Sequence, residues 1–271
     1  MKKINSISLI AGFFIAAMFT PSIINAEEDA AEIAKKLANP IASMISVPFQ
    51  FNYDSNYGPN DNGHKSFVNI QPVIPISLND DWNVISRTIV PVVWQSDIVP
   101  GAGSQTGIGN ITQSIFFSPK APTERGWIWG AGPVIVIPTA SDDLLGGDQW
   151  GLGPTAVALK QDGPNTMGML INHVWSVSDD DGPNQKISST FLQPFYVYGK
   201  DGITYSINTE STYNWETEDW TVPINALVSK VMRWGDQTVQ VGGGVRYWAE
   251  SADIGPEGWG LRFQITLVYP K

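Results

Sequence analysis

The sequence predicts an all-β protein, an antiparallel transmembrane β-barrel of about twelve strands that follows a signal peptide and a short helix. Three observations predict this class. The C-terminal segment alternates apolar and polar residues, eleven further segments show strand-like alternation, and long and short connections alternate between them. After the N-terminal region no apolar run reaches the ~18 residues that a membrane-spanning helix needs.

Residues 1–26 are predicted to be a secretory signal peptide. Lys2 and Lys3 give a basic start, residues 7–19 are apolar, and cleavage is expected after Ala26. An uncleaved anchor helix is the alternative, which Pro21 disfavours. An exported barrel of this kind is expected in the bacterial outer membrane.

A short helical segment is predicted over residues 27–44, with the helix itself at 27–39 and a stop at Pro40. Ile33 and Leu37 belong to its one apolar side. The helix is short and modestly apolar, so we expect it to pack against or into a larger body.

Residues 45–271 are predicted to form the barrel itself. Alternation and turn residues define its strands. The predicted strands are 46–54, 66–78, 82–95, 109–118, 127–139, 149–160, 166–177, 187–198, 203–212, 220–232, 237–249 and 258–269. Their even number is what single-chain bacterial barrels require.

The last predicted strand, 258–269, has one apolar and one mostly polar face. Trp259 and Tyr269 stand at the two ends of an apolar stripe, where aromatic residues of barrels meet the two membrane interfaces. The alternate positions are mostly polar and include Arg262. An Arg that faces lipid near mid-membrane costs about 2–4 kcal/mol, so Arg262 is expected to point into the barrel.

The predicted connections fall into two classes that alternate along the chain. Those at 55–65 and 96–107 are long and polar, whereas those at 79–81 and 199–202 are tight turns. Outer-membrane barrels have long outer loops and short periplasmic turns. Acidic residues gather in the long class, which predicts an acidic outer rim.

Prolines conflict with uninterrupted strands in this scheme. Eight lie within or at the ends of predicted strands: Pro72, Pro75, Pro91, Pro133, Pro138, Pro154, Pro194 and Pro223. Proline cannot donate to a ladder, and a closed barrel has no free edge. Bulges, or strands that extend beyond the membrane, would accommodate several of them.

The inward face is predicted to carry the functional residues. The lumen-lining candidates, assigned by parity from the apolar stripes, are Gln71, Arg87, Glu210, Arg246 and Arg262. Charged residues inside a barrel tune what passes or binds. The alternative is that they pair with one another and plug the barrel, and the sequence leaves both open.

No pattern in the sequence predicts catalysis, a cofactor or a metal site. The chain has no Cys and two His, which removes thiolate metal sites. His173 and Ser176 are three residues apart and would face opposite sides of one strand. An outer-membrane lipid hydrolase that uses His173 remains an alternative function. The run Asp179-Asp180-Asp181 lacks the spacing of a calcium loop.

Charge limits the partners. The formal net charge is −10, and loss of Lys2 and Lys3 with the signal peptide would make it −12. Such a chain repels nucleic acid, so no nucleic-acid partner is expected. The expected partners are outer-membrane lipid, lipopolysaccharide and a small-molecule solute, and nothing in the sequence predicts an oligomeric state.

The alternative fold is a secreted or periplasmic β-sandwich that binds carbohydrate through its Trp residues.

An ordered series of short motifs runs through nearly the whole mature chain. The motifs are Asn39-Pro40, Val47-Pro48, Ile70-Gln71-Pro72-Val73-Ile74-Pro75, residues 82–91 around Arg87, Gly107-Ile108-Gly109-Asn110, Phe116-Phe117-Ser118-Pro119-Lys120, Gly130-Ala131-Gly132-Pro133, Pro138-Thr139, Gly153-Pro154, Asn172-His173-Val174-Trp175-Ser176 and Gln193-Pro194-Phe195. In these motifs the chain resembles the MetA-pathway of phenol degradation family of outer-membrane proteins. The resemblance implies a barrel that passively passes small solutes, aromatic or hydrophobic ones among them, and it brings no catalytic residues. Asn110, where an Asp is expected, and the end at Tyr269-Pro270-Lys271 depart from the pattern.

Overall fold

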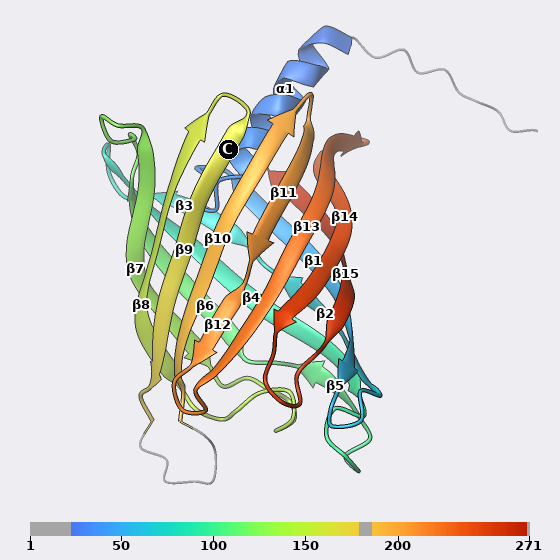
Figure 1. Ribbon diagram of the computed structural model, residues 1–271. Helices are drawn as coiled ribbons and strands as arrows, with labels where there is room; N and C mark the ends of the chain where they lie inside the picture. Colours follow the sequence, from blue (N-terminus) through green and yellow to red (C-terminus); the bar gives the residue numbers. More distant parts are fainter. Residues whose placement is uncertain (1–22, 179–185, 270–271) are drawn as a thin grey trace, which may run out of the picture.

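The computed structural model describes residues 23–178 and 186–269 of the chain, and side chains from Asp29 onward within these ranges. Residues 1–22 of the predicted signal peptide and the acidic run at 179–181 lie outside the described residues. The described chain forms one helix and one antiparallel sheet that closes on itself (Figure 1).

The helix α1 spans Ile23–Leu37 and fifteen strands follow it. The strands are β1 (Ile45–Tyr57), β2 (Gly63–Ile70), β3 (Val73–Ser77), β4 (Trp82–Ser96), β5 (Ser104–Ile108), β6 (Ile111–Pro119), β7 (Trp127–Ile137), β8 (Gly151–Asp162), β9 (Asn165–Ser176), β10 (Ser188–Lys200), β11 (Ile203–Thr209), β12 (Ser211–Asn214), β13 (Asp219–Trp234), β14 (Gln237–Glu250) and β15 (Gly258–Tyr269). Three barrel strands are each split in two, as β2/β3, β5/β6 and β11/β12, so the ring has 12 strands.

Pairing of the first strand with the last closes the ring. The β1–β15 ladder runs from Ile45 opposite Tyr269 to Tyr53 opposite Leu261. Closure removes the unpaired edges that a lipid environment would leave without hydrogen bonds. The predicted all-β barrel of twelve strands is confirmed, and the two-sheet sandwich is wrong because no sheet edge remains between the first and last strands.

Most connections sort by length to the two ends of the barrel as predicted, with the longer β6–β7 connection at 120–126 and the shorter β12–β13 connection at 215–218 as exceptions. In Figure 1 the short turns, α1 and the C-terminal end of β15 lie at the upper end, and the longer loops lie at the lower end. The β10–β11 turn has Asp201 at φ 54° and Gly202 at φ 73°. Positive φ at both central residues is the type I′ geometry that suits the twist of a tight hairpin. By the architecture of outer-membrane barrels, the end with the short turns is the periplasmic one.

Prolines coincide with the splits in the strands. Pro72 separates β2 from β3, and Pro91 of β4 faces the gap between β5 and β6. Pro194 of β10 lies beside the gap between β11 and β12, where the register puts it opposite Thr209 and puts Gln193 opposite Glu210. Proline has no backbone N–H, so it cannot donate a hydrogen bond to the neighbouring strand. The strand pairing is therefore interrupted at these positions.

The remaining prolines also lie where pairing fails on one side. Pro133 and Pro154 face each other across β7 and β8, and each stands at an interruption of the ladder to its other neighbour. Pro223 adjoins a register shift in β13. Pro75 lies beyond the single pair of β1 with β3, and Pro138 follows the end of β7. The barrel thus accommodates all eight prolines.

The exterior of the barrel is apolar and the interior mostly polar. On β15, Trp259 and Leu261 are 64% and 60% exposed, whereas Arg262 and Thr266 are 3% and 1% exposed. All 11 tryptophans lie within two residues of a strand end, and Trp248 among them points into the lumen, where it bonds Asp54. Only hydrocarbon stabilises such a continuous apolar exterior, and Trp prefers the membrane interfaces.

Helix α1 begins at Ile23 rather than at residue 27 and ends at Leu37, close to the predicted end. It contacts β10, β11 and β13 at the mouth with the short turns, where the Gln161 Nε2 donates to the Lys35 carbonyl at 2.8 Å. Within the described chain, no helix has the length and apolar character to cross a bilayer.

The segment after α1 enters the barrel and fills part of its interior. Ile41 is 4% exposed and packs in one apolar cluster with Phe116, Leu159 and Leu170. The Ile41 amide donates to the side-chain oxygen of Asn39 at 3.0 Å, which fixes the local turn. We refer to residues 38–44 as the inner segment.

Candidate functional site: two cavities and an ionic wall

The barrel interior holds a cavity on each side of a charged wall. The inner cavity, of about 230 Å³, lies beside the inner segment and is lined by residues that include Gln71, Arg87, Glu210 and Arg262. The outer cavity, of about 310 Å³, lies nearer the long loops and is lined by residues that include Asp54 and Lys65.

Glu210 and Arg262 form the strongest part of the wall. The Arg262 Nη1 and Nη2 each donate to a different carboxylate oxygen of Glu210, both at 2.8 Å. The Arg262 Nε donates to the Asn52 Oδ1 at 2.7 Å. A two-pronged pair of this kind combines strength with a fixed orientation. Glu210 stands at the break between β11 and β12, and its carboxylate reaches across the lumen to β15.

Arg246 connects this pair to the outer cavity. Its Nη2 donates to Glu210 at 3.4 Å and its Nη1 to the Asp54 Oδ2 at 3.2 Å. The guanidinium also lies 4.4 Å from the Trp248 ring centroid, and the Trp248 Nε1 donates to the Asp54 Oδ1 at 3.0 Å. Arg246 lines neither cavity and bonds a residue of each. We call Asn52, Asp54, Glu210, Arg246 and Arg262 the ionic wall.

Arg87 lies on the inner-cavity side and outside this wall. Its Nη2 donates to the Gln71 Oε1 at 3.0 Å, and the Gln71 Nε2 donates to the Gln50 Oε1 at 3.3 Å. Within the described chain the Arg87 guanidinium makes no ion pair. Neutral amides therefore position Arg87 and leave its charge uncompensated by direct contact.

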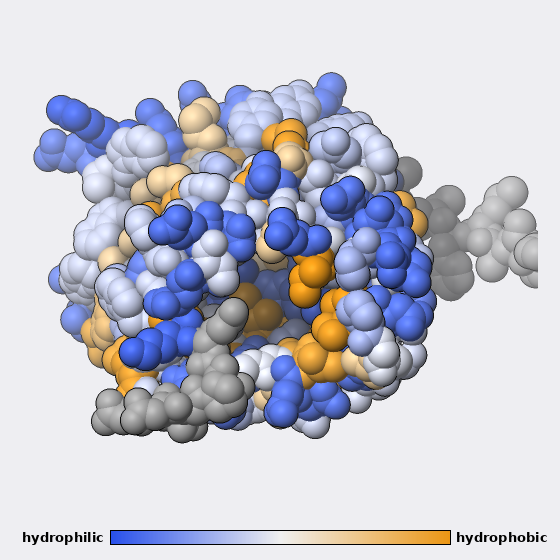
Figure 2. All heavy atoms as spheres, turned by 60° about the horizontal axis from the view of Figure 1, so that its bottom comes forward, coloured by the Kyte–Doolittle hydropathy of each residue, from blue (hydrophilic) through white to orange (hydrophobic). Residues whose placement is uncertain are grey.

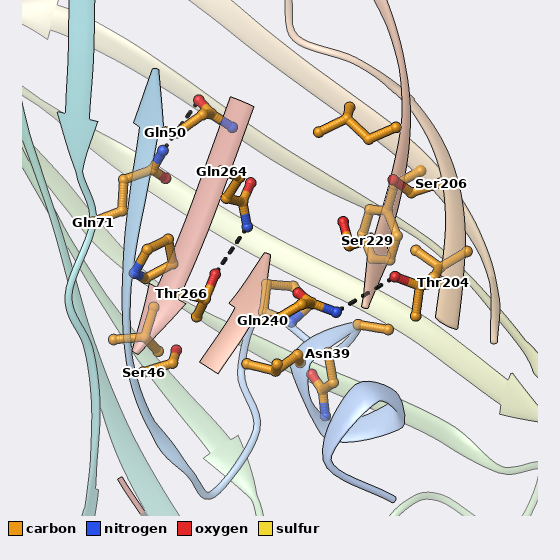
Figure 3. Close-up of a pocket in the computed structure, with 18 of the residues that line it drawn as sticks. Asn39, Ser46, Gln50, Gln71, Thr204, Ser206, Ser229, Gln240, Gln264 and Thr266 are labelled. Carbon is orange, nitrogen blue, oxygen red and sulfur yellow. Dashed lines mark hydrogen bonds between the residues drawn. The ribbon is translucent and has the colours of Figure 1, made fainter. Parts of the chain in front are cut away.

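Neutral polar side chains cover much of the remaining inner cavity (Figure 3). The Gln240 Nε2 donates to the Thr204 hydroxyl at 3.4 Å, and the Gln264 Nε2 donates to the Thr266 hydroxyl at 3.1 Å. Asn39 of the inner segment faces the same space. Amides and hydroxyls offer donors and acceptors to a polar solute without adding charge.

A loop narrows the outer mouth. The connection between β7 and β8 folds back so that the Gln95 Nε2 donates to the Leu144 carbonyl at 3.0 Å and the Asn110 Nδ2 to the Gly147 carbonyl at 2.6 Å. Leu145 of this loop lines the outer cavity. Figure 2, which brings this end forward, shows a hollow with hydrophobic residues along part of its wall.

The five sequence-predicted lumen residues all lie inside the barrel, in two hydrogen-bonded groups. Glu210, Arg246 and Arg262 share the ionic wall, and Gln71 and Arg87 form a separate pair beside it. Trp259 and Tyr269 lie outward and exposed. Asn52, Asp54 and Trp248 were not among the predicted lumen residues, although Asn52 and Asp54 alternate with the outward Phe51 and Tyr53 of β1.

His173 lies on the outer surface, away from the lumen. Its Nδ1 is 2.7 Å from the Thr190 hydroxyl, and its ring centroid is 4.1 Å from that of Trp175. The Ser176 hydroxyl accepts a hydrogen bond from the Ile187 amide instead. The structure therefore does not bring His173 and Ser176 together. No set of three or more His, Cys, Asp or Glu is arranged to hold a metal within residues 23–178 and 186–269.

A closed antiparallel ring, an apolar exterior with Trp at both ends and a charged interior define a transmembrane β-barrel of the bacterial outer-membrane type. Solved structures share the fold. An outer-membrane channel from Pseudomonas putida F1 is similar with a TM-score of 0.66 and 15% identity, over 84% of this chain and 96% of that one. Outer membrane phospholipase A from Escherichia coli is similar with a TM-score of 0.50 and 11% identity, over 89% and 98% of the two chains. No family model and no curated protein matches the chain.

Proposed function

We propose that the protein passes small solutes passively across the outer membrane through its lumen, without chemistry. The observation that carries the proposal is the pair of cavities on opposite sides of a single ionic wall. Between the two cavities a solute then meets one layer of side chains, and the inner segment and the β7–β8 loop narrow the lumen on either side of them. The ionic wall is the selective constriction of this route.

Arg246 is the movable part of the constriction. Its bonds to Asp54 and Glu210 measure 3.2 and 3.4 Å, whereas the two Arg262 bonds to Glu210 measure 2.8 Å. The Arg246 Nε is buried and has no partner among the described residues. Weaker, incompletely satisfied hydrogen bonds cost less to exchange for bonds to water or solute.

The similarity to the Pseudomonas putida outer-membrane channel supports the proposed passage, and the motif series supports membership of the MetA-pathway of phenol degradation family. Small aromatic or hydrophobic molecules are then the proposed solutes, and outer-membrane lipid and lipopolysaccharide the proposed surroundings. The lipid-hydrolase alternative has less support, because His173 pairs with Thr190 and has no activated Ser beside it.

Conductance of the purified protein in a planar bilayer tests the proposal. Arg246→Ala shortens the long side chain in the wall, so we expect a larger single-channel conductance than in the unaltered protein. Arg233→Ala removes a cation from an exposed position near the short turns and should leave conductance unchanged. A bilayer that stays silent with both the unaltered protein and Arg246→Ala would contradict passage through the lumen.

A further inference from the structure

The geometry points to a binding site for a small monocarboxylate in the inner cavity, with Arg87 as the residue that holds the carboxylate. This inference rests on the proposed function, because it names a solute class for the same lumen. Three features carry it: the charge balance of the interior, the free donors of Arg87, and the size and chemistry of the cavity.

The strand residues of the ionic wall and the two cavities carry an excess of positive charge. Lys65, Arg87, Arg246 and Arg262 are cationic, and only Asp54 and Glu210 are anionic. The two carboxylates are both engaged with Arg246, and Glu210 also with Arg262. The lumen of an otherwise acidic protein is therefore locally suited to anions.

Arg87 is a cation of the inner cavity that has no carboxylate in direct contact within the described chain, although Glu210 attracts it from a distance. One of its Nη atoms donates to Gln71, whose own amide donates to Gln50, and no further hydrogen bond of its guanidinium is formed within the described chain. Arg donors form a planar fork that matches the two oxygens of a carboxylate. One unpaired guanidinium compensates one negative charge, which favours a monoanion.

The cavity also provides room and apolar contact for the body of such a solute. Val73, Phe195 and Leu227 contribute to its lining. An apolar cavity of about 150 Å³ can hold a benzene molecule, and the inner cavity measures about 230 Å³. A single ring or a short chain bearing one carboxylate fits this space, and the Gln and Thr side chains around it can satisfy further polar atoms.

Lys36 does not replace Arg87 in this role, although it also lines the inner cavity. Its Nζ is 2.6 Å from the Glu32 carboxylate on the exposed side of α1. Its charge is therefore already compensated by direct contact.

Calorimetric titration of the detergent-solubilised full chain with benzoate, benzamide and inorganic phosphate tests the inference. Benzoate and benzamide have nearly the same shape, so the difference between them reports the charge. We expect benzoate to bind, benzamide to bind at least about tenfold more weakly, and phosphate not to compete. Arg87→Gln should weaken benzoate about ten- to hundredfold, the range for one charge-assisted hydrogen-bond set, whereas Arg125→Ala at an exposed turn should not.

Gln264→Glu gives a second route if Arg87→Gln does not fold. It places a carboxylate in the same cavity without altering Arg87, and it should also abolish benzoate binding. Equal binding of benzoate and benzamide, competition by phosphate, or unchanged benzoate affinity in the folded variant would overturn the site. A protein that conducts ions but does not bind benzoate would contradict this inference alone, whereas benzoate binding in a silent bilayer would contradict passage alone.

Discussion

Glu210 bonds two buried arginines of the barrel interior, Arg246 and Arg262. It accepts two hydrogen bonds from Arg262 and one from Arg246, and it does so from the point where β11 breaks off and β12 begins. Pro194 of β10 faces the same break. The local loss of backbone pairing thus coincides with the residue on which the ionic wall depends.

Replacement of Glu210 should therefore destabilise the barrel. Glu210→Gln leaves two buried guanidinium groups without their shared charge, and breaking a buried pair in this way costs about 3–5 kcal/mol. We expect the urea midpoint of unfolding from lipid vesicles, followed by Trp fluorescence, to fall by a corresponding amount. Glu216→Gln, in an exposed loop, should leave the midpoint unchanged; equal midpoints for both variants would show that the wall contributes no stability.

The alternation of residues along a strand assigns each side chain to the inward or the outward face, but it does not predict which residue that side chain will bond. Gln71, Arg87, Glu210, Arg246 and Arg262 could be placed inward because apolar neighbours mark the outward face. The partners of Arg262 could not be predicted in the same way. Asn52 lies opposite Arg262 only across the β1–β15 seam, so the contact exists only once the ring has closed.

At the scale of elements, the inner segment occupies part of the lumen beside the inner cavity. Ile41 anchors it in a cluster with Ile85 and Phe116 on one side of the barrel wall, and Asn39 and Met44 border the inner cavity. Packing of an apolar side chain in a closed cluster stabilises this position. The segment therefore narrows the periplasmic end of the lumen.

Ile41→Asp should release the inner segment and widen the lumen. A carboxylate in an apolar cluster loses its hydration without gaining a partner. The inner segment is therefore expected to leave the apolar cluster, while the sheet stays closed. Single-channel conductance in a planar bilayer should then increase. Lys35→Ala, on the exposed side of α1, is the matched control, and an unchanged conductance in Ile41→Asp would show that the segment does not obstruct the lumen.

The helix was predictable from the sequence, whereas the strands against which it packs were not. The apolar side of residues 27–39 and Pro40 predicted a short helix that packs against a larger body, and α1 with its inner segment does so. Which strands it contacts depends on the curvature of the closed sheet. The accommodation of the prolines was not predictable either. Pro133 of β7 lies directly opposite Pro154 of the neighbouring β8, and no local sequence pattern predicts this register.

At the scale of the whole molecule, three zones follow one another outward from the lumen: an excess of positive charge, a hydrogen-bonded ring and an apolar exterior. Acidic side chains at the long-loop end, such as Asp142, Asp253 and Glu257, are exposed, as the predicted acidic rim requires. The fold class, strand number and alternation of loops were predictable because lipid permits only closed sheets or helices. The closure register and the position of the ionic wall were not, since both depend on contacts distant in sequence.

Loss of positive charge in the lumen should change ion preference. Arg87→Ala removes a cation of the inner cavity that no carboxylate of the described chain contacts directly, so the preference for chloride over potassium should fall. The change would be seen as a shift of the reversal potential in a salt gradient across a planar bilayer. Arg262→Ala should also shift the reversal potential, whereas Arg125→Ala should not. Selectivity that is the same in all three variants would contradict the placement of Arg87 and Arg262 in the conduction path.

The most direct test of the central claim, a closed ring with lipid outside and a polar lumen inside, is a nitroxide scan of β15 in lipid vesicles. The chain contains no Cys, so single cysteines can be introduced and spin-labelled one by one from Gly258 to Tyr269. Collision with oxygen, which concentrates in lipid, should alternate with period two and peak at the positions of Leu261, Phe263 and Ile265, with minima at Arg262 and Gln264. A profile without this alternation, or with its maxima at Arg262 and Gln264, would contradict the account.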